Sequence, residues 1–389
     1  MFSSRLPRYA VANALTQLLE SLKARRVDVV DLTETNPTRA GLDYPPGLLA
    51  PLTAPAALTY EPFPLGMPAA RSAVVVDQRR RGIDVDPAHV VLTASTSEAY
   101  SWLFKLLCKP GDAVLVPTPS YPLFEQLTAL DAVSAHPYSL EYHGRWSIDL
   151  ASLAEAPDNT RAVLLVSPNN PTGSYLTRSD LAHLSALCVR RRWALIVDEV
   201  FADYPLETNE TPLTDIACRS TDVLSFSLGG LSKTVGLPQL KLSWMIVGGP
   251  ALERDAALTA LELIADAYLS VATPVQVAAS HLLCAGTSVR AGIHARIRGN
   301  LEALRAFAAM FRSCDVLRVE GGWSAVVRVP ATRPEEQLVV DLLEREHILV
   351  HPGYFFDFPR EAYVVVSLLP PPDVFGDGVA RLLRFVTRE

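Results

Sequence analysis

The sequence is short of cysteine, of net charge and of long hydrophobic runs, and each shortage removes a class of protein. Its five cysteines are scattered and show no CxxC spacing, so neither a disulfide framework nor a zinc site is expected. The formal net charge of −7 gives no electrostatic reason to expect nucleic acid or an anionic membrane as a partner. No apolar run is long enough to span a membrane, and the N-terminal residues lack the apolar core of a signal peptide. We therefore expect a soluble protein of the reducing cytoplasm, without a bound metal.

Repeats and low-complexity linkers are also absent from the 389 residues. A hydrophobic content of 49% is ample for a core, and the length favours two domains or one large domain. Two arginine runs, at 79–81 and 190–192, raise the question of a basic patch. Both lie in segments that look helical, and Gly82 is typical of a helix end. We interpret the arginines as cations placed favourably near helix C-termini.

Apolar runs and helix-like segments alternate between residues 90 and 250, which predicts a parallel α/β domain. Beyond residue 250 the sequence favours helices to about residue 313, followed by the strand-like runs and helices of an α+β unit. A helix near 9–25 and a short strand come first in the chain. The expected strands of the α/β domain cover 90–93, 113–117, 161–166, 194–197, 223–226 and 243–247, with a helix at 177–192.

The segment from Ser227 to Trp244 carries two lysines in a setting rich in hydroxyl groups and glycine. Lys233 follows Ser232 and lies between two glycine-containing stretches, so the backbone can come close to a ligand here. Lys241 precedes an apolar run that is expected to be a buried strand. A lone lysine is usually a solvated surface residue, so this segment acquires meaning only together with others upstream.

Polar side chains follow two of the expected strands. Ser95, Thr96, Ser97 and Glu98 open a helix, and Ser95 with Glu98 forms a capping-box pattern, which needs no ligand. A hydroxyl-rich turn into a helix also offers free N–H groups and a positive dipole end to a phosphate, and the two interpretations are compatible. Asp198 ends another strand, where α/β proteins place ligand groups, although a capping role is about as common.

Five segments together resemble the class I/II aminotransferase family of fold-type-I pyridoxal-phosphate (PLP) enzymes. They occur in the family's order and at spacings like the family's, and the resemblance covers about residues 30 to 370. The segments are TASTSEAY (93–100), PTPSYP (117–122), SPNNPTG (167–173), VDEVF (197–201) and LSK (231–233).

The resemblance implies an α/β fold with two domains. The larger has a mainly parallel sheet of the seven-stranded type, flanked by helices, and the smaller is α+β. We expect an N-terminal segment at 1–45 that joins the small domain, a large PLP-binding domain at 46–285 and the small domain at 286–389.

The resemblance also implies PLP as the cofactor, held by Lys233 as a Schiff base, with the freed amine moving a proton during transamination. Asp198 would keep the pyridine nitrogen protonated, so that the ring accepts electrons. Tyr121 would lie against the ring, and Asn170 would contact its phenolic oxygen. The other implied cofactor-binding residues are Ser95, Thr96, Ser97, Phe201, Ser232, Lys241 and Tyr60, and the implied substrate-binding residues are Asn36, Arg39, Asn170 and Arg360.

Four positions depart from the family's pattern. Lys241 stands where the family usually has an arginine that binds the phosphate, and Gly230 where it often has serine or threonine. Phe201 replaces a tyrosine that donates to the phenolic oxygen. Val365 occupies the place of the arginine that binds the substrate's α-carboxylate.

Without that arginine, a carboxylate would be buried against valine at a high cost in free energy. Either Arg360 or Arg39 takes its role, or the substrate is not an ordinary α-amino acid.

The expected activity is transfer of an amino group between an amino acid or amine and a 2-oxo acid. Two alternatives remain open: a decarboxylase or lyase that uses the same Lys233 and Asp198, and a protein that binds PLP without turnover. The resemblance implies a homodimer in which Tyr60 reaches the partner's cofactor phosphate. Neither nucleic acid nor a membrane is expected as a partner.

Overall fold

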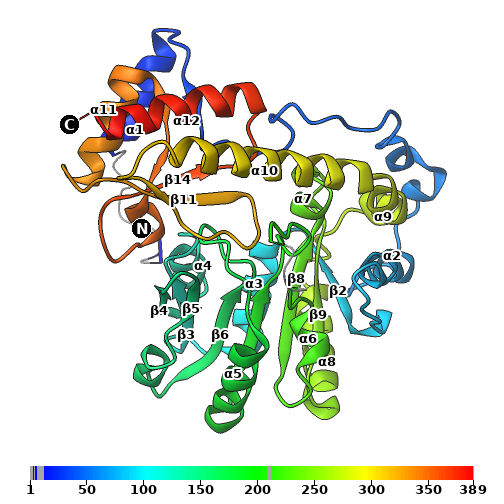
Figure 1. Cartoon of the computed structure of the whole chain (residues 1–389). Helices are drawn as coiled ribbons and strands as arrows, with labels where there is room; N and C mark the ends of the chain where they lie inside the picture. The colour runs from blue at the N-terminus through cyan, green and yellow to red at the C-terminus, as the bar shows by residue number, and fades with distance from the viewer. Residues whose placement is uncertain (1–2, 4, 7–12, 208–211, 389) are drawn as a thin grey trace.

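The structure, a computed structural model, describes residues 3, 5–6, 13–207 and 212–388. A large α/β domain occupies the lower part of Figure 1, and a smaller layer of helices and short strands lies above it. Among the described helices, none combines the length and the apolar character that crossing a bilayer requires.

The large domain is built on one sheet of eight strands, in the order β2-β9-β8-β7-β6-β3-β4-β5. The five strands from β8 to β4 are parallel, whereas β9 runs antiparallel to both β2 and β8. The strands span β2 (Val90–Thr93), β3 (Ala113–Thr118), β4 (Ser134–Tyr142), β5 (Trp146–Ile148), β6 (Thr160–Val166), β7 (Ala194–Asp198), β8 (Ser225–Gly230) and β9 (Ser243–Gly248).

The sheet has one strand more than the seven-stranded type expected from the sequence. The additional strand, β5, pairs antiparallel with the end of β4, from Leu140↔Ile148 to Tyr142↔Trp146. Gly144 in the connecting turn has φ +79°, a conformation that glycine adopts without strain, so the chain can reverse there.

Strand β8 begins two residues later and runs four residues further than the segment 223–226 suggests. It ends in two glycines, which sequence patterns count against a strand. Both are packed tightly: a Cβ on Gly229 would lie 2.6 Å from Nε1 of Trp244 on the neighbouring strand. The absence of a side chain therefore allows β9 to pack here, and β8 carries the chain directly to Lys233.

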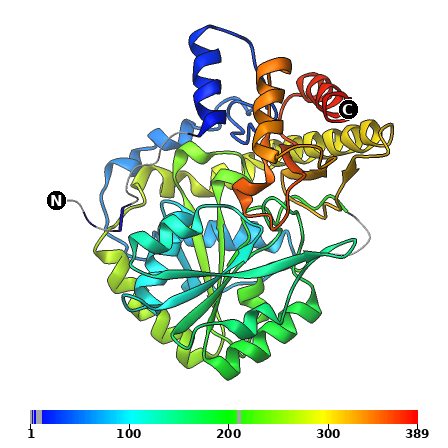
Figure 2. The same cartoon turned by 90° about the vertical axis from the view of Figure 1, so that its left-hand side faces the viewer.

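Helices cover both faces of the sheet, as the edge-on view in Figure 2 shows. Alternate residues of β7 face opposite ways: Ile196 packs in the same cluster as Trp102 of α3, and Leu195 packs with Leu184 of α5. Such burial on both faces explains the nearly continuous apolar sequence of the parallel strands. The helices are α2 (Pro68–Arg79), α3 (Thr96–Leu107), α4 (Phe124–Leu130), α5 (Arg178–Arg191), α6 (Ile216–Arg219), α7 (Leu231–Thr234), α8 (Ala251–Asp266) and α9 (Thr273–Ala285).

The smaller layer has a sheet of four strands in the order β10-β11-β14-β13, with helices packed beside it. The N-terminal segment joins this layer, because β1 pairs with β12 and α1 stands beside α11 in Figure 2. Residues 9–12 of the helix expected at 9–25 lie outside the described residues. The elements are α1 (Ala14–Ala24), β1 (Val30–Asp31), α10 (Thr287–Ala308), β10 (Asp315–Val316), β11 (Ser324–Arg328), α11 (Glu335–Glu346), β12 (Ile348–Leu349), β13 (His351–Pro352), β14 (Tyr363–Ser367) and α12 (Pro372–Val386).

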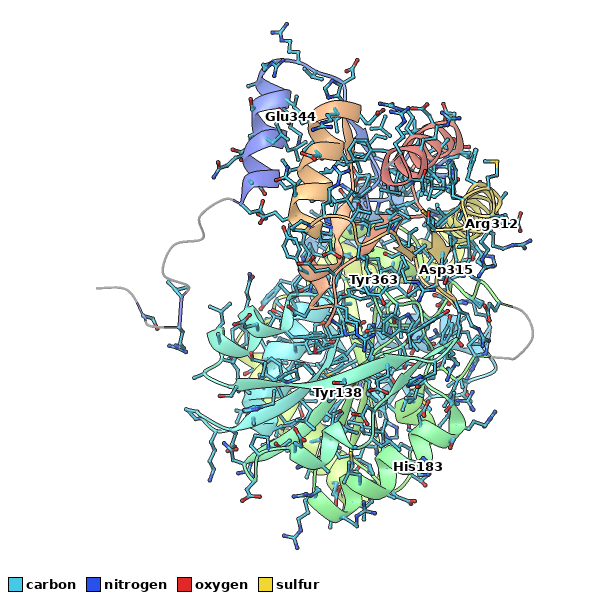
Figure 3. The ribbon with its side chains drawn as sticks, turned by 60° about the vertical axis from the view of Figure 1, so that its left-hand side comes forward. Tyr138, His183, Arg312, Asp315, Glu344 and Tyr363 are labelled. Atoms are coloured by element: carbon cyan, nitrogen blue, oxygen red, sulfur yellow. The ribbon has the colours of Figure 1, made fainter. Side chains whose placement is uncertain are left out.

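The two layers share a hydrophobic cluster. Tyr138 of β4 is buried in this cluster, and Tyr363 of β14 packs against it from the other layer; both are labelled in Figure 3. This shared packing holds the small sheet over the carboxyl ends of the large one.

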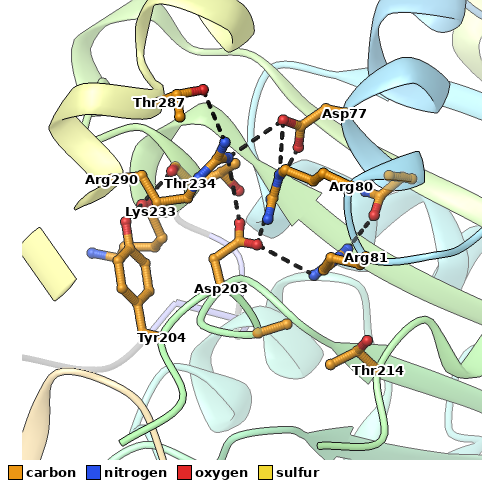
Figure 4. Close-up of polar contacts among 12 residues, drawn as sticks. Asp77, Arg80, Arg81, Asp203, Tyr204, Thr214, Lys233, Thr234, Thr287 and Arg290 are labelled. Carbon is orange, nitrogen blue, oxygen red and sulfur yellow. Dashed lines mark hydrogen bonds and ion pairs between the residues drawn. The ribbon is translucent and has the colours of Figure 1, made fainter. Parts of the chain in front are cut away.

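A buried ionic network joins α2 to the long helix α10 and to the loop after β7 (Figure 4). Arg80 pairs with Asp77 and Asp203, and Arg81 donates to Asp215 across 2.7 Å. Nη1 of Arg290 lies 3.3 Å from Oδ1 of Asp77. Arg80 and Arg81 lie beyond the last residue of α2, and both pair with acids of the segment after β7, so the first arginine run does more than end a helix.

We expect Arg290→Ala to lower the free energy of unfolding by about 3 kcal/mol, because it leaves Asp77 buried with a partner removed. The control is Arg298→Ala on the same helix, whose exposed pair with Glu302 should contribute less than about 0.5 kcal/mol. Thermal unfolding of the two variants measures the difference. Equal midpoints for both would show that the network does not stabilise the fold.

Candidate active site

A cavity of about 330 Å³ opens at the carboxyl ends of the central strands, beneath the small sheet. It brings together every cofactor-binding residue expected from the sequence except Tyr60. Those lining residues are Ser95, Thr96, Ser97, Tyr121, Asn170, Asp198, Phe201, Ser232, Lys233 and Lys241. They come from six separate stretches of the chain, which meet because parallel strands end at the same edge of a sheet.

Asp198 is the last residue of β7, and its carboxylate is held on both oxygens. Oδ2 accepts a hydrogen bond of 3.1 Å from the hydroxyl of Tyr100, and Oδ1 accepts one of 3.1 Å from the N–H of Val200. Burial raises the pKa of Asp198 to about 6, while these two bonds and the charge of Lys233 oppose the rise. The group is therefore an anion at neutral pH, fixed in direction and aimed into the cavity.

Lys233 lies on the single-turn helix α7, immediately after β8. Its Nζ lies 5.5 Å from the ring centre of Phe201 and 4.9 Å from that of Trp323. The hydroxyl of Tyr204 donates to the carbonyl oxygen of Lys233 across 2.5 Å, which fixes the backbone (Figure 4). Burial lowers the pKa of Lys233 to about 8, against the opposing effect of the Asp198 charge. In a fraction of the protein molecules Lys233 is therefore a neutral, nucleophilic amine at physiological pH.

This lowered pKa can be tested in the cofactor-free protein. The rate at which an amine reagent labels Lys233, read from the mass of its peptide, should rise with pH through a midpoint near 8 rather than the ordinary 10.5. In Asp198→Asn the midpoint should fall further, because the carboxylate favours the protonated lysine. A midpoint near 10.5 in the unaltered protein would contradict the argument.

The start of α3 forms a polar wall of the cavity. Ser95 is the N-cap, and its Oγ accepts from the N–H of Glu98 at 3.1 Å. The reciprocal bond of a capping box is replaced, since the Glu98 carboxylate accepts from the N–H of Ala94 instead. The first N–H groups of a helix have no intrahelical partner, and Thr96 and Ser97 present them beside the cavity. An anion is favoured at this end of the helix.

Lys241 provides a second cation in this region. It has φ +52°, a left-handed conformation that places it in the turn just before β9. Elsewhere in the cavity lining, Oδ1 of Asn170 accepts a hydrogen bond of 3.2 Å from the hydroxyl of Ser324 of β11. Tyr121 also lines the cavity and is 47% exposed, so its ring is not buried in the hydrophobic core.

Four residues expected at the site do not line this cavity within one chain. Tyr60 is 69% exposed and lies in a separate shallow pocket with Phe63. The side chain of Asn36 accepts from its own loop, at Thr38, although the neighbouring Thr35 does reach the cavity. The other two, Arg39 and Arg360, are exposed on the surface.

Val365 lies in the middle of β14, paired with Val326 and His351. It is 2% exposed and packs in the same hydrophobic cluster as Phe356, so the position offers an apolar surface and no cation. Among the described residues that line the cavity none is an arginine.

Several residues of the site were not expected from the sequence. Tyr100 lies four residues after Thr96 on α3, and this helical spacing could have indicated that it faces the same way. Trp323 and Ser324 come from the small sheet, and no local motif marks them. Ser243 lies at the start of β9, where its apolar neighbours indicate only a buried strand.

The fold is that of the fold-type-I aminotransferases. The sequence model of the family "Aminotransferase class I and II" matches residues 66–369, and the chain belongs to this family.

Curated relatives agree with this assignment over nearly the whole chain. The glutamate-pyruvate aminotransferase AlaA of Escherichia coli strain K12 is 24% identical, and the match covers 97% of this chain and 95% of that protein. An alanine aminotransferase of Mycobacterium tuberculosis is 26% identical, with 97% and 90% covered. Among solved structures, an alanine aminotransferase from Pyrococcus furiosus has a TM-score of 0.88 at 22% identity and covers each chain fully, at 100%. A double mutant of the aspartate aminotransferase of Thermus thermophilus has a TM-score of 0.85 at 20% identity, with 99% of each chain covered. The activity is accordingly that of an aminotransferase acting on amino and 2-oxo acids.

Proposed function

We propose that this aminotransferase uses PLP held in the cavity by Lys233, and that Asp198 braces the opposite side of the cofactor ring. The observation that carries the proposal is the pairing of a lysine of lowered pKa with a fixed, buried carboxylate across one cavity. The residues fit the cofactor chemically: an amine for its aldehyde, an anion for its pyridinium nitrogen, and a helix N-terminus with Lys241 for its phosphate.

Bound PLP supplies an electron-accepting ring that stabilises the negative charge developing at the substrate's Cα. Asp198, as an anion, would keep a proton on the ring nitrogen. The amine of Lys233 would be a base poised near neutral pH that accepts the proton from the substrate's Cα. Tyr121 offers a flat aromatic surface for stacking, and Asn170 offers an amide to the ring's oxygen.

A screen of reaction type tests the proposal. The holoenzyme is incubated with glutamate or alanine and with pyruvate or 2-oxoglutarate, since the names of the relatives point to these pairs. We expect a new amino acid that forms only when the 2-oxo acid is present. Release of carbon dioxide or ammonia without a 2-oxo acid would favour a decarboxylase or lyase. Cofactor binding without any turnover would favour the non-catalytic alternative.

We also propose a homodimer in which Tyr60 completes the neighbouring site, because this exposed aromatic residue lies apart from the cavity of its own chain.

The free state of all five cysteines supports a location of the protein in the reducing cytoplasm. The pairing of β1 with β12 and the position of α10 support the domain division at residues 45 and 285.

A further inference from the structure

Gly230 and Ser243 face each other across the ends of β8 and β9, where both residues line the cavity. A Cβ built on Gly230 would lie 2.4 Å from Oγ of Ser243, closer than side-chain atoms approach one another. The space beside these two strands therefore holds one side chain only. In this chain the hydroxyl of Ser243 occupies it.

The hydroxyl has no partner of its own. Ser243 is 3% exposed, and Oγ forms no hydrogen bond with any residue that the structure describes. A buried hydroxyl normally has a hydrogen-bond partner, because leaving it without one costs free energy. The hydroxyl is open to the cavity that Ser243 lines, so a bound ligand can supply the partner that no described residue provides.

The position of Ser243 in the sheet indicates which part of a ligand it meets. On one side it pairs with Gly230, which leads directly into the turn of Lys233. On the other side it pairs with Thr93, from which the chain enters the N-terminus of α3. Lys241 lies two residues before it. The hydroxyl is therefore flanked by a cation and by a helix end that favours an anion.

Resting on the proposed function, we propose that Ser243 donates a hydrogen bond to the phosphate of the cofactor. Residue 230 at the end of β8 is glycine and has no hydroxyl, so Ser243 on the neighbouring strand β9 supplies one instead. Gly230 is in turn required, since any side chain there would displace Ser243. A hydroxyl side chain can therefore stand at residue 230 or at residue 243, but not at both.

Cofactor binding to the cofactor-free protein tests this role without reference to activity. Ser243→Ala keeps the Cβ and loses the hydroxyl, and it should weaken PLP binding by about tenfold to hundredfold, the usual effect of a bond to a charged group. Binding of pyridoxal, which lacks the phosphate, should not change. Absorbance titrations measure both constants. The matched control is Ser225→Ala, at the far end of the same pair of strands, which should leave PLP binding unaltered.

An exchange of the two residues gives the second arm of the test. Gly230→Ser alone should weaken PLP binding because it clashes with Ser243, whereas Gly230→Ser combined with Ser243→Gly should restore it within about threefold. Equal loss of PLP and pyridoxal binding in Ser243→Ala, or no loss at all, would overturn the inference. Failure of the unaltered protein to bind PLP would instead overturn the proposed function, so the two failures are distinguishable.

Discussion

Replacing Lys233 by alanine should lower the rate of amine transfer by about 10³-fold or more. The change removes both the covalent anchor for the cofactor and the base near the reacting carbon, and acid–base catalysis alone typically contributes 10²- to 10⁴-fold. Neither of the two rings that the structure describes beside the Nζ, those of Phe201 and Trp323, can take over the role of the amine. Initial rates with the best substrate pair measure the loss.

Two further variants separate chemistry from charge and folding. Lys233→Arg retains a cation near the two rings but cannot anchor the cofactor aldehyde, so it should be as inactive as alanine. Lys105→Ala removes a lysine of α3 that pairs with Asp131 and does not line the cavity, and it should retain the wild-type rate. More than a tenth of the wild-type rate in Lys233→Ala would mean that another group carries the reaction.

Asp198→Asn should lower the rate by about 10²- to 10³-fold, because a neutral amide no longer holds the proton of the ring nitrogen. The shape of the side chain is unchanged, and the amide oxygen can still accept from the N–H of Val200. The fall should therefore appear in kcat, with little loss of folded protein on thermal unfolding.

Tyr100→Phe is the control for the hydrogen bond alone. It leaves the charge of Asp198 in place and removes one donor, so we expect a loss of about tenfold or less. That donor also opposes the raised pKa of Asp198, so the acidic limb of the pH–rate profile should move to higher pH. If Tyr100→Phe and Asp198→Asn have equal effects, the charge is not the essential property of the carboxylate.

Lys233 and Asp198 could be predicted from the sequence because each belongs to a local motif that resembles the family's pattern. Asp198 ends the apolar strand β7, and Lys233 lies on α7, which directly follows β8. A parallel sheet brings the ends of its strands to one edge whatever the details of packing. For the same reason the hydroxyl groups at 95–97 could be assigned to the same cavity.

Trp323 could not be found in this way. It comes from a loop of the small sheet, and it reaches Lys233 only because a shared hydrophobic cluster holds the two layers together. The ion pairs that Arg80 and Arg81 form were likewise hidden, since their partners Asp203 and Asp215 are more than 100 positions away in the chain. The composition of the arginine run describes only residues that are neighbours in the sequence. It contains no information on which distant acidic residues pair with these arginines.

The sequence by itself determined the class of fold, because the periodicity of strands and helices is a short-range property of the chain. Its motifs, through their resemblance to the family, indicated the activity and predict Lys233 and Asp198 as the reacting pair. Only the tertiary structure decided how the strands match in register, and with it that Ser243 stands against Gly230. Register depends on the packing of side chains from neighbouring strands, such as Trp244 over Gly229, and this packing exists only once the sheet has formed.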